Sequence, residues 1–269
     1  MIKFCKVTKL LLIMLPAIIW SYLTWLFRYS RHPEKYPIEK RYAKFHRLML
    51  KVTKHCHTDM MIEGLEHLEK LKEGSLIAAN HLSVMDIVLI GSLSKRPISF
   101  IAKKEAKKIP FVGRCIRVID GQFLDRHDAR QAVRCFQKAQ ELAKIDKISY
   151  VIYPEGTRNK NPYTSGVAEF HAGSFRLALR NQKDLLLMCQ FGTQRILSND
   201  SHFSSNPIQI TFKTPLFYEK LKDLSTTDIA EKAHEIVDKE FETMKLKDKK
   251  YIDELRYKKK APKWWKEFI

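Results

Sequence analysis

The segment Ser75-Leu76-Ile77-Ala78-Ala79-Asn80-His81-Leu82-Ser83-Val84-Met85-Asp86 joins a short apolar run to a polar turn. A short apolar run that ends at polar residues is typical of a buried β-strand. Apolar residues follow at positions 87–90, and Ser83 and Asp86 have the S-x-x-[DE] spacing found near the start of a helix. The segment therefore predicts a strand, a turn and a helix, which is the repeating unit of α/β proteins.

His81 and Asp86 are the candidate catalytic pair within this segment. On one regular helix a separation of five residues places side chains roughly 140° apart, so they would not share a face. They meet only if His81 lies in the turn and Asp86 lies in the first turn of the helix. An imidazole beside a carboxylate can remove a proton from an alcohol. Asp86 could instead only cap the helix, but capping does not explain His81.

A second polar segment, Tyr153-Pro154-Glu155-Gly156-Thr157-Arg158, follows another apolar run at positions 148–153. It contains a cation and a glycine in a turn, a combination that can hold a phosphate group. An arginine in such a segment can also form an ordinary surface ion pair. The two segments in this order, behind an apolar and basic N-terminus, form a more specific pattern than either does alone.

The two segments resemble the NHxxxxD and PEGTR blocks of the glycerolipid acyltransferases, the family of 1-acylglycerol-3-phosphate acyltransferases. Gly121-Gln122-Phe123-Leu124-Asp125-Arg126 is similar to the family's intermediate block, and Phe170-His171-Ala172-Gly173-Ser174-Phe175 resembles its FxxGxF segment. Ala102-Lys103-Lys104-Glu105, followed by Pro110 and Gly113, also fits. The likeness runs from about residue 62 to residue 197. The proline that the family usually has near positions 186–188 is absent here.

The resemblance implies a catalytic role for His81 and Asp86 and no enzyme nucleophile; the chain has no G-x-S-x-G motif. It also implies phosphate binding by Arg126 and by the PEGTR residues Glu155, Gly156, Thr157 and Arg158. The two arginines can grip a phosphate with fork geometry, and Lys103 can add a point charge. Glu155 would repel a phosphate, so we expect it to orient the loop or an arginine. We expect no cofactor and no metal.

The implied reaction moves a fatty acyl group from an acyl thioester to the sn-2 hydroxyl of 1-acyl-sn-glycerol 3-phosphate (lysophosphatidate) and yields phosphatidate. The donor is either acyl-CoA or an acyl carrier protein. An acyltransferase for a different lysophospholipid is the nearest alternative, which the missing proline keeps open. A non-catalytic, basic membrane-binding protein is the alternative from another class. Nucleic-acid binding would explain the charge but neither the apolar terminus nor the paired motifs.

The N-terminus and the net charge point to a membrane. The chain has 49 Lys and Arg against 30 Asp and Glu, a formal net charge of +19, which suits an anionic membrane surface. Positions 10–27 carry no charge and are flanked by cations. This length is near the lower limit for crossing a bilayer, and Pro16 would kink the helix, so a span, a re-entrant anchor and an in-plane helix are all possible. No small-residue cleavage site follows, which disfavours a signal peptide. We expect a cell-membrane protein with its catalytic domain on the cytoplasmic side.

The remaining pattern predicts an α/β fold with a central mixed sheet flanked by helices, preceded by an N-terminal membrane-associated helical hairpin. The second hairpin helix has an apolar stripe, which either lies in the membrane interface or packs on the protein's own domain. Further strands are expected at 98–102, 115–119, 148–153, 185–191 and 208–212, and a helix at 129–145. We divide the chain into membrane-anchoring helices at 1–58, an α/β acyltransferase domain at 59–245 and a basic, Trp-containing tail at 246–269.

The cysteines do not suggest a disulfide framework, because the five of them are scattered and odd in number. His55-Cys56-His57 invites a metal site, but no second cluster supplies the remaining ligands at a zinc spacing. We therefore interpret this tripeptide as the polar end of a helix.

Overall fold

The computed structural model describes residues 2–125, 128–145, 147–198 and 205–253. Within these ranges the strands form one seven-stranded sheet in the order β1-β7-β6-β2-β5-β3-β4. All neighbouring strands are parallel except β6 and β7, which are antiparallel. The strands are β1 Thr58–Glu63, β2 Leu76–Ala79, β3 Ile98–Lys103, β4 Gln122–Leu124, β5 Ser149–Ile152, β6 Leu185–Phe191 and β7 Asn206–Phe212. The predicted mixed sheet is confirmed.

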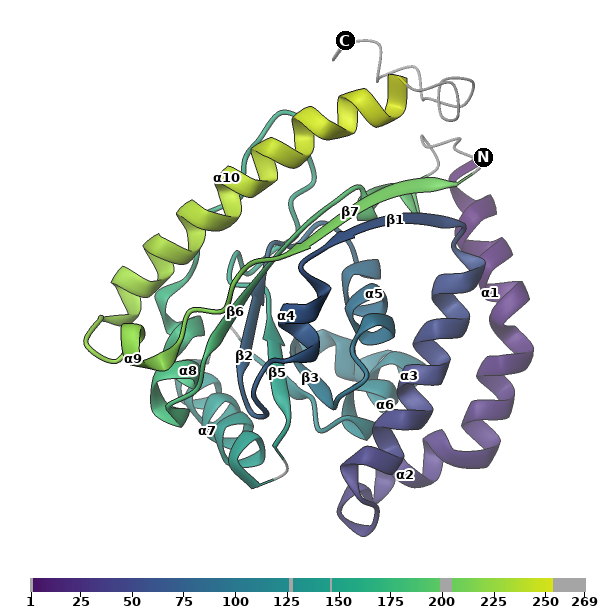
Figure 1. Ribbon diagram of the computed structural model, residues 1–269. Coiled ribbons are helices and arrows are strands. Elements are labelled where there is room, and N and C mark those ends of the chain that lie inside the picture. Colours follow the sequence, from purple (N-terminus) through teal and green to yellow (C-terminus); the bar gives the residue numbers. More distant parts are fainter. Residues whose placement is uncertain (1, 126–127, 146, 199–204, 254–269) are drawn as a thin grey trace.

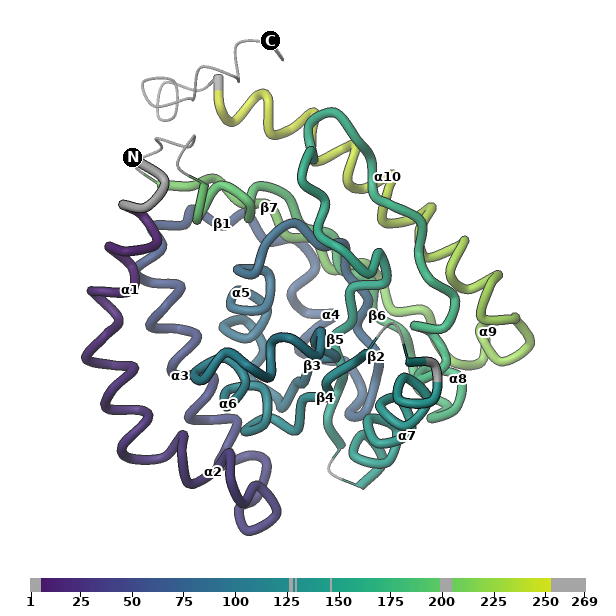
Figure 2. The backbone as a smooth tube through the Cα atoms, turned by 180° about the vertical axis from the view of Figure 1, so that it is seen from behind, coloured from purple at the N-terminus to yellow at the C-terminus, as the bar shows by residue number. Residues whose placement is uncertain are grey.

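Helices cover both faces of the sheet, as Figure 1 shows. One layer contains α1 Ile2–Ser21, α2 Phe27–Arg31, α3 Ile38–His55, α4 Leu65–Glu69, α5 Met85–Leu93 and α6 Pro110–Val118. The other contains α7 Ala129–Ile145, α8 Arg176–Asn181, the short α9 Tyr218–Leu221 and α10 Thr226–Asp253. The layers lie on opposite sides of the strands in Figure 2 as well.

The central strands are buried on both faces, which explains their continuous apolar sequences. In β2, Ile77 and Ala79 belong to the hydrophobic core beneath α3 and α5. Leu76 and Ala78 belong to the second core, beneath α7, α8 and α10. This alternation follows from the two-residue period of a strand. Because β2 is buried on both faces, the polar residues after Ala79 are held at the carboxyl end of this central strand.

The N-terminal helices form the predicted hairpin. α1 continues through a π-helical segment, Tyr22–Leu26, into α2, and the chain then reverses into α3. α3 packs mainly against α5, and its stripe residues Ile38, Tyr42, Phe45 and Met49 are buried. Of the two interpretations of that stripe, packing on the protein's own domain is therefore confirmed. Lys6–Arg31 is long and apolar enough to cross a membrane, judged by length and composition.

Two helices differ from the sequence-based expectation: α6 in its type of structure and α10 in its length. The expected strand at 115–119 was wrong, because residues through Val118 belong to α6. Pro110 occupies the first turn of α6, where its missing N–H costs nothing. Residues 115–119 are too few to distinguish the helical period from the strand period. In addition, α10 continues past Lys245 to Asp253, beyond the residue at which the sequence placed the end of the domain.

Candidate active site

The parallel strands bring the sequence blocks together at their carboxyl ends, here called the His81 edge of the sheet. β2 and β5 are neighbours with Ala78 opposite Ile152, so the turn after Ala79 lies beside the loop that begins at Tyr153. β3 pairs with β5 on its other side, which places Lys103 at the same edge. β4 pairs with β3 and ends at Leu124, opposite Lys103. Arg126, two residues farther on, lies outside the described residues.

His81 and Asp86 meet as the sequence predicted. His81 Nδ1 donates to Asp86 Oδ2 at 2.7 Å. The His81 side chain is 17% exposed, whereas the Asp86 side chain is fully buried. His81 lies in the turn, and α5 begins at Met85. This contact fixes the tautomer of the imidazole and leaves Nε2 as the nitrogen that can take a proton.

Asp86 also holds the turn that precedes α5, although α5 has Val84 at its N-cap and no side-chain capping hydrogen bond. Its Oδ2 accepts from the backbone N–H groups of Leu82 at 2.8 Å and Ser83 at 2.9 Å. Ser83 Oγ in turn accepts from the N–H of Met85 at 3.2 Å. Holding the backbone of the turn and holding the His81 ring are therefore two tasks of one carboxylate. The turn that carries His81 is built around the group that orients its ring.

Thr193 holds the other oxygen of this carboxylate, a contact that sequence reasoning missed. Thr193 is fully buried, and its Oγ1 donates to Asp86 Oδ1 at 2.5 Å. It follows Gly192, whose φ of +90° and close approach to Pro207 O leave no room for a Cβ. Both oxygens of Asp86 are thus engaged by protein groups. No spacing signal marks Thr193, which is 107 residues from Asp86.

Asn80 and Gln190 join the ends of β2 and β6 beside the histidine, and sequence reasoning missed them too. Asn80 Nδ2 donates to Gln190 O at 2.9 Å, and the Gln190 N–H donates to Asn80 Oδ1 at 2.8 Å. Gln190 Nε2 also donates to Asn80 O at 2.8 Å. These three bonds tie the backbone just before His81 to the neighbouring strand. Asn80, the asparagine of the NHxxxxD block, therefore has a structural task in this fold.

Glu155 anchors the PEGTR loop to the histidine turn. Its Oε1 accepts from the backbone N–H of His81 at 2.6 Å, and its Oε2 accepts from the N–H of Ala168 at 3.0 Å. Burial raises the pKa of the Glu155 carboxyl above its ordinary value, although the two N–H groups act against that shift. Because both oxygens accept from backbone amides, Glu155 orients the loop. This is one of the two roles expected from the sequence, the other being to orient an arginine.

Tyr153 forms one wall beside the catalytic ring. Its ring stacks on His81 with 4.2 Å between the ring centres and 21° between the planes. Its hydroxyl oxygen is buried and has no hydrogen-bond partner among the described residues. Burial, with the nearby Asp86 charge, raises the pKa of Tyr153 well above its ordinary value. The tyrosine therefore acts as a neutral surface that limits rotation of the imidazole.

The remaining PEGTR residues differ in their availability. Gly156 adopts a φ of +70°, and its N–H donates to Tyr153 O at 3.0 Å, so this amide closes the turn. Thr157 and Arg158 are exposed at the rim, and Arg158 has no ion pair with any described residue. Asn159 N–H donates to His81 O at 2.8 Å, which holds the far end of the loop against the histidine.

Lys103 lies at the same edge but is already paired. Its Nζ is 3.5 Å from Glu105 Oε1, and the side chains are about half exposed, 57% and 49%. Exposed pairs of this kind contribute little to stability and exchange readily. Lys103 therefore stays available to an anionic ligand. Within the described ranges, no three His, Cys, Asp or Glu side chains cluster in a way that would hold a metal ion.

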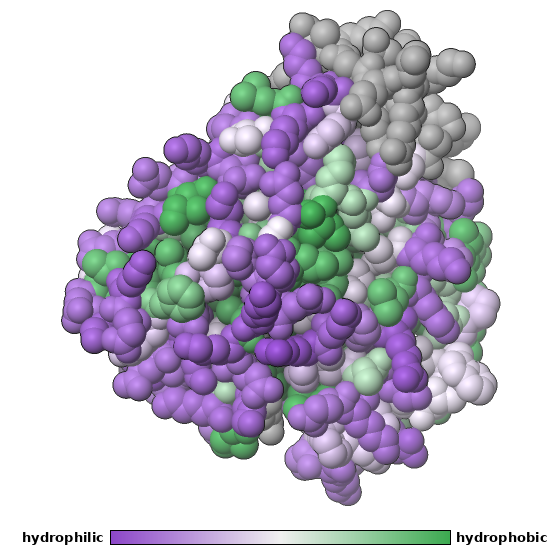
Figure 3. Space-filling model, in the orientation of Figure 1, coloured by the Kyte–Doolittle hydropathy of each residue, from purple (hydrophilic) through white to green (hydrophobic). Residues whose placement is uncertain are grey.

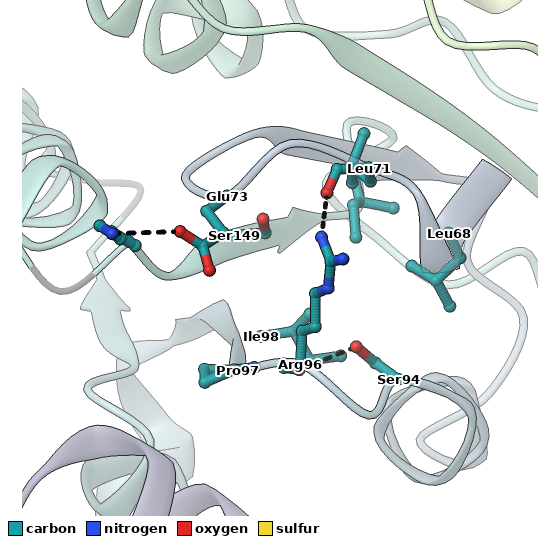
Figure 4. A pocket seen from close by; sticks show the side chains of 10 residues that line it. Leu68, Leu71, Glu73, Ser94, Arg96, Pro97, Ile98 and Ser149 are labelled. Atoms are coloured by element: carbon teal, nitrogen blue, oxygen red, sulfur yellow. Dashed lines mark hydrogen bonds and ion pairs between the residues drawn. The ribbon is translucent and has the colours of Figure 1, made fainter.

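The hollow drawn in Figure 4 lies at the amino ends of the parallel strands, away from the His81 edge. It is lined by residues that precede β3 and β5, including Arg96, Pro97 and Lys147. Arg96 Nη1 donates to Leu71 O at 2.8 Å across it, and Lys147 pairs with Glu73 at 3.5 Å. None of the site residues lines this hollow, so it is separate from the His81 edge.

Comparisons with known proteins agree with this geometry. A family model described as Acyltransferase matches residues 59–188. The 1-acyl-sn-glycerol-3-phosphate acyltransferase of Saccharomyces cerevisiae is 28% identical over 194 residues, which are 70% of this chain and 60% of the yeast protein. The probable 1-acyl-sn-glycerol-3-phosphate acyltransferase of Mycoplasma pneumoniae is 24% identical over 245 residues, covering 85% of this chain and 89% of that protein.

The fold is similar to a solved structure along most of its length. The crystal structure of the 1-acyl-sn-glycerophosphate acyltransferase PlsC from Thermotoga maritima matches with a TM-score of 0.65 and 25% identity. The match covers 89% of this chain and 98% of that one. By contrast, the chain spans only 60% of the yeast relative and 48% of a chloroplast relative from Arabidopsis thaliana.

Proposed function

The chain belongs to the glycerolipid acyltransferase family, and we propose that it transfers a fatty acyl group from an acyl thioester to the sn-2 hydroxyl of 1-acyl-sn-glycerol 3-phosphate, forming phosphatidate. The observation that carries this proposal is the contact of 2.7 Å between His81 Nδ1 and the buried Asp86. It leaves one partly exposed imidazole nitrogen at the edge where the other family blocks converge.

His81 acts as the general base and then as the general acid in this reaction. Its Nε2 takes the proton of the acceptor hydroxyl while that oxygen attacks the thioester carbonyl. The tetrahedral intermediate collapses, the carbon–sulfur bond breaks, and the imidazolium returns the proton to the leaving thiolate. Asp86 stabilises the imidazolium and holds its orientation. The acyl group passes directly to the acceptor, so no covalent enzyme intermediate forms.

The phosphate of the acceptor binds at the rim of the same edge. Arg158 is exposed and has no competing carboxylate among the described residues, which suits a fork-shaped contact with a phosphate. Lys103 adds a second cation. Arg126, which comes two residues after the end of β4 in the sequence, is proposed as a third. Thr157 and Gly156 shape the turn that presents Arg158.

The N-terminal helices anchor the protein to a membrane in the plane of its surface. One side of α1 packs on the core, where Met14, Trp25 and Leu26 of the continuous helix are buried. Large apolar residues are exposed along the continuous helix from Val7 to Phe27: Val7, Leu11, Leu12, Ile13, Leu15, Ile19, Trp20, Leu23 and Phe27. A helix attached to its domain along one side cannot also be surrounded by lipid, so we favour in-plane binding over a span. Figure 3 shows hydrophobic groups along the right-hand margin, where α1 lies, beside a mostly hydrophilic face.

An acyl-transfer assay with a panel of acceptors tests the proposed function. Labelled acyl-CoA and acyl carrier protein are each offered with lysophosphatidate and with lysophospholipids of other headgroups, in detergent. Phosphatidate as the main product supports the proposal and identifies the donor. Transfer to a different headgroup would keep the chemistry and replace the acceptor. Absence of transfer from both donors, with vesicle binding intact, would favour a non-catalytic membrane-binding protein.

A further inference from the structure

A short segment between β3 and α6, here called the ledge, combines exposed apolar side chains with unpaired cations. The ledge consists of the 3-10 helix Lys104–Lys108 together with Ile109 and the first turn of α6 as far as Val112. Ile109 is 52% exposed and Val112 is 41% exposed. Lys107 and Lys108 are exposed and make no ion pair with any described residue. No other task at the site uses these four side chains.

The apolar residues of the ledge are held outward by a well-bonded backbone. The Gly113 N–H donates to Ile109 O at 2.8 Å, and the Ile109 N–H donates to Ala106 O at 3.2 Å. A Cβ on Gly113 would lie 2.7 Å from Lys107 O, so only glycine permits this close approach. Phe111 packs against the core between its two exposed neighbours. The exposure of Ile109 and Val112 therefore follows from the fold.

The ledge adjoins the apolar N-terminal helix. Arg114, in α6, donates to Ser30 Oγ at 3.0 Å. Its guanidinium carbon lies 4.7 Å from the centre of the Phe27 ring and 5.2 Å from that of Tyr22. Phe27 itself is 42% exposed, and Leu23 one turn earlier is 76% exposed. Exposed apolar surface thus occurs on both sides of the junction between the N-terminal helix and α6.

At its other end the ledge adjoins the candidate active site. It begins directly after Lys103, the last residue of β3. Lys104 Nζ is 2.5 Å from Asp125 Oδ2, which fixes the ledge to the end of β4. Figure 2 shows the chain between β3 and α6 on the side of the sheet that also carries α1 and α3. The ledge therefore connects the anchoring helix with the edge that carries His81.

We propose that the ledge is a second membrane contact, which turns the His81 edge toward the lipid surface. Ile109 and Val112 insert at the level of the headgroups, and Lys107 and Lys108 bind anionic headgroups. The inference rests on the proposed function, because a lipid acceptor must enter the site from that surface. A single helix lying in the membrane plane leaves the domain free to rotate about it. Contacts by both the N-terminal helix and the ledge fix the orientation of the domain.

Vesicle binding and interfacial kinetics of the full chain test this inference. The apolar variant combines Ile109→Ser with Val112→Ser, and the charge variant combines Lys107→Gln with Lys108→Gln. Matched controls on the opposite helix layer are Val133→Ser, 44% exposed on α7, and Lys232→Gln with Lys239→Gln on α10. Dissociation constants are measured on phosphatidylcholine vesicles with and without phosphatidylglycerol. Turnover is measured with lysophosphatidate in those vesicles and with a dispersed short-chain analogue.

We expect the apolar variant to bind all vesicles about tenfold more weakly. We expect the charge variant to lose about fivefold per lysine, and only when anionic lipid is present. Turnover at the vesicle surface should fall in both variants, while their turnover with the dispersed analogue stays unchanged. Both control proteins should match the wild type in every measurement. Vesicle binding equal to that of the controls would overturn the inference. An equal loss of turnover at the vesicle surface and with the dispersed analogue would also overturn it, because it would place these side chains against the substrate. A wild type that binds vesicles but transfers nothing would refute the proposed function instead.

Discussion

At the scale of single residues, Asp86 connects the parts of the candidate site. Its carboxylate accepts hydrogen bonds from the His81 ring, from the backbone of the histidine turn and from Thr193. A buried carboxylate is stable only when its oxygens are bonded in this way. The same bonds hold the imidazole in one orientation. Protein stability and proton transfer therefore depend on the same group.

Thr193→Val should weaken both properties, because it leaves Asp86 Oδ1 buried without its donor. We expect the free energy of unfolding to fall by about 1–3 kcal/mol. We expect kcat to fall by about tenfold, equivalent to about 1.4 kcal/mol in the barrier, with little change in KM. Urea unfolding in mild detergent and steady-state acyl transfer measure the two effects.

Two variants separate the hydrogen bond from the packing of the threonine. Thr193→Ser keeps the hydroxyl and should recover most of kcat. Thr53→Val removes a buried hydroxyl that has no hydrogen-bond partner in the described part of the chain, and it should leave stability and kcat close to those of the wild type. Equal kcat values for Thr193→Val and the wild type would show that this contact does not position Asp86.

Local spacing made part of the site predictable and left part of it hidden. The turn before a helix could be inferred for His81 and Asp86 because they are close in sequence and a capping pattern surrounds them. Gln190, in β6, and Thr193, in the 3-10 helix just after β6, reach the same place from more than a hundred residues later. Each is a common residue without a motif, and their position depends on the pairing of β2 with β6. Only tertiary structure supplies that information.

At the scale of elements, the loop after β5 depends on Glu155. Glu155→Gln should cost about 1–3 kcal/mol of unfolding free energy. A glutamine offers one acceptor oxygen, so one of the N–H groups of His81 and Ala168 would face an amide donor. Urea unfolding compares this variant with Glu169→Gln, an exposed neighbour that should be neutral. Equal stability of the two variants would contradict the anchoring role of Glu155.

The same carboxyl predicts a pH dependence with a definite sign. Burial raises the pKa of Glu155 in the folded protein, so the folded state binds its proton more tightly than the unfolded state does. The resulting stabilisation is complete below the ordinary pKa of a glutamate and is lost as the pH rises through the folded-state pKa. The stability difference between wild type and Glu155→Gln should therefore be larger at mildly acidic pH than at neutral pH. A difference that grows with rising pH would contradict this.

Element prediction succeeded where burial leaves a clear pattern in the sequence. The central strands β2, β5 and β6 are buried on both faces and appear as apolar runs. β1 was not predicted, because Thr58–Glu63 lies at an edge of the sheet, is only partly buried and has a mixed sequence. Residues 115–119 are mostly apolar and too short a stretch to exclude a strand, although residues 115–118 end α6.

At the scale of the whole molecule, a buried ion pair joins α10 to the rest of the fold. Arg195 donates to both carboxylate oxygens of Asp248, and each side chain is 1% exposed. Arg195 also donates to the Tyr163 hydroxyl, at 2.9 Å from Nε, and to Pro207 O at 2.9 Å. The end of α10, the loop after PEGTR and β7 thus meet at one guanidinium. This arrangement explains why the helix stays ordered past Lys245.

Asp248→Asn should destabilise the whole fold rather than one element. Removing one partner leaves a buried charge without compensation, which costs about 3–5 kcal/mol. Urea unfolding measures the change against Glu235→Gln, an exposed substitution on the same helix that should be neutral. A loss below about 1 kcal/mol, typical of an exposed pair, would contradict the burial of this one.

The most direct measurement of the central claim compares His81→Ala with the wild type in acyl transfer from labelled thioester to lysophosphatidate, with vesicle binding measured in parallel. General acid–base catalysis is worth about 10²–10⁴-fold, so kcat should fall by at least about a hundredfold. Vesicle binding should stay close to that of the wild type. The free energy of unfolding should fall by no more than about 1–3 kcal/mol, because the His81 ring donates only one of the hydrogen bonds to the buried Asp86. Phosphatidate formation by His81→Ala at the wild-type rate would contradict the assignment of His81 as the base.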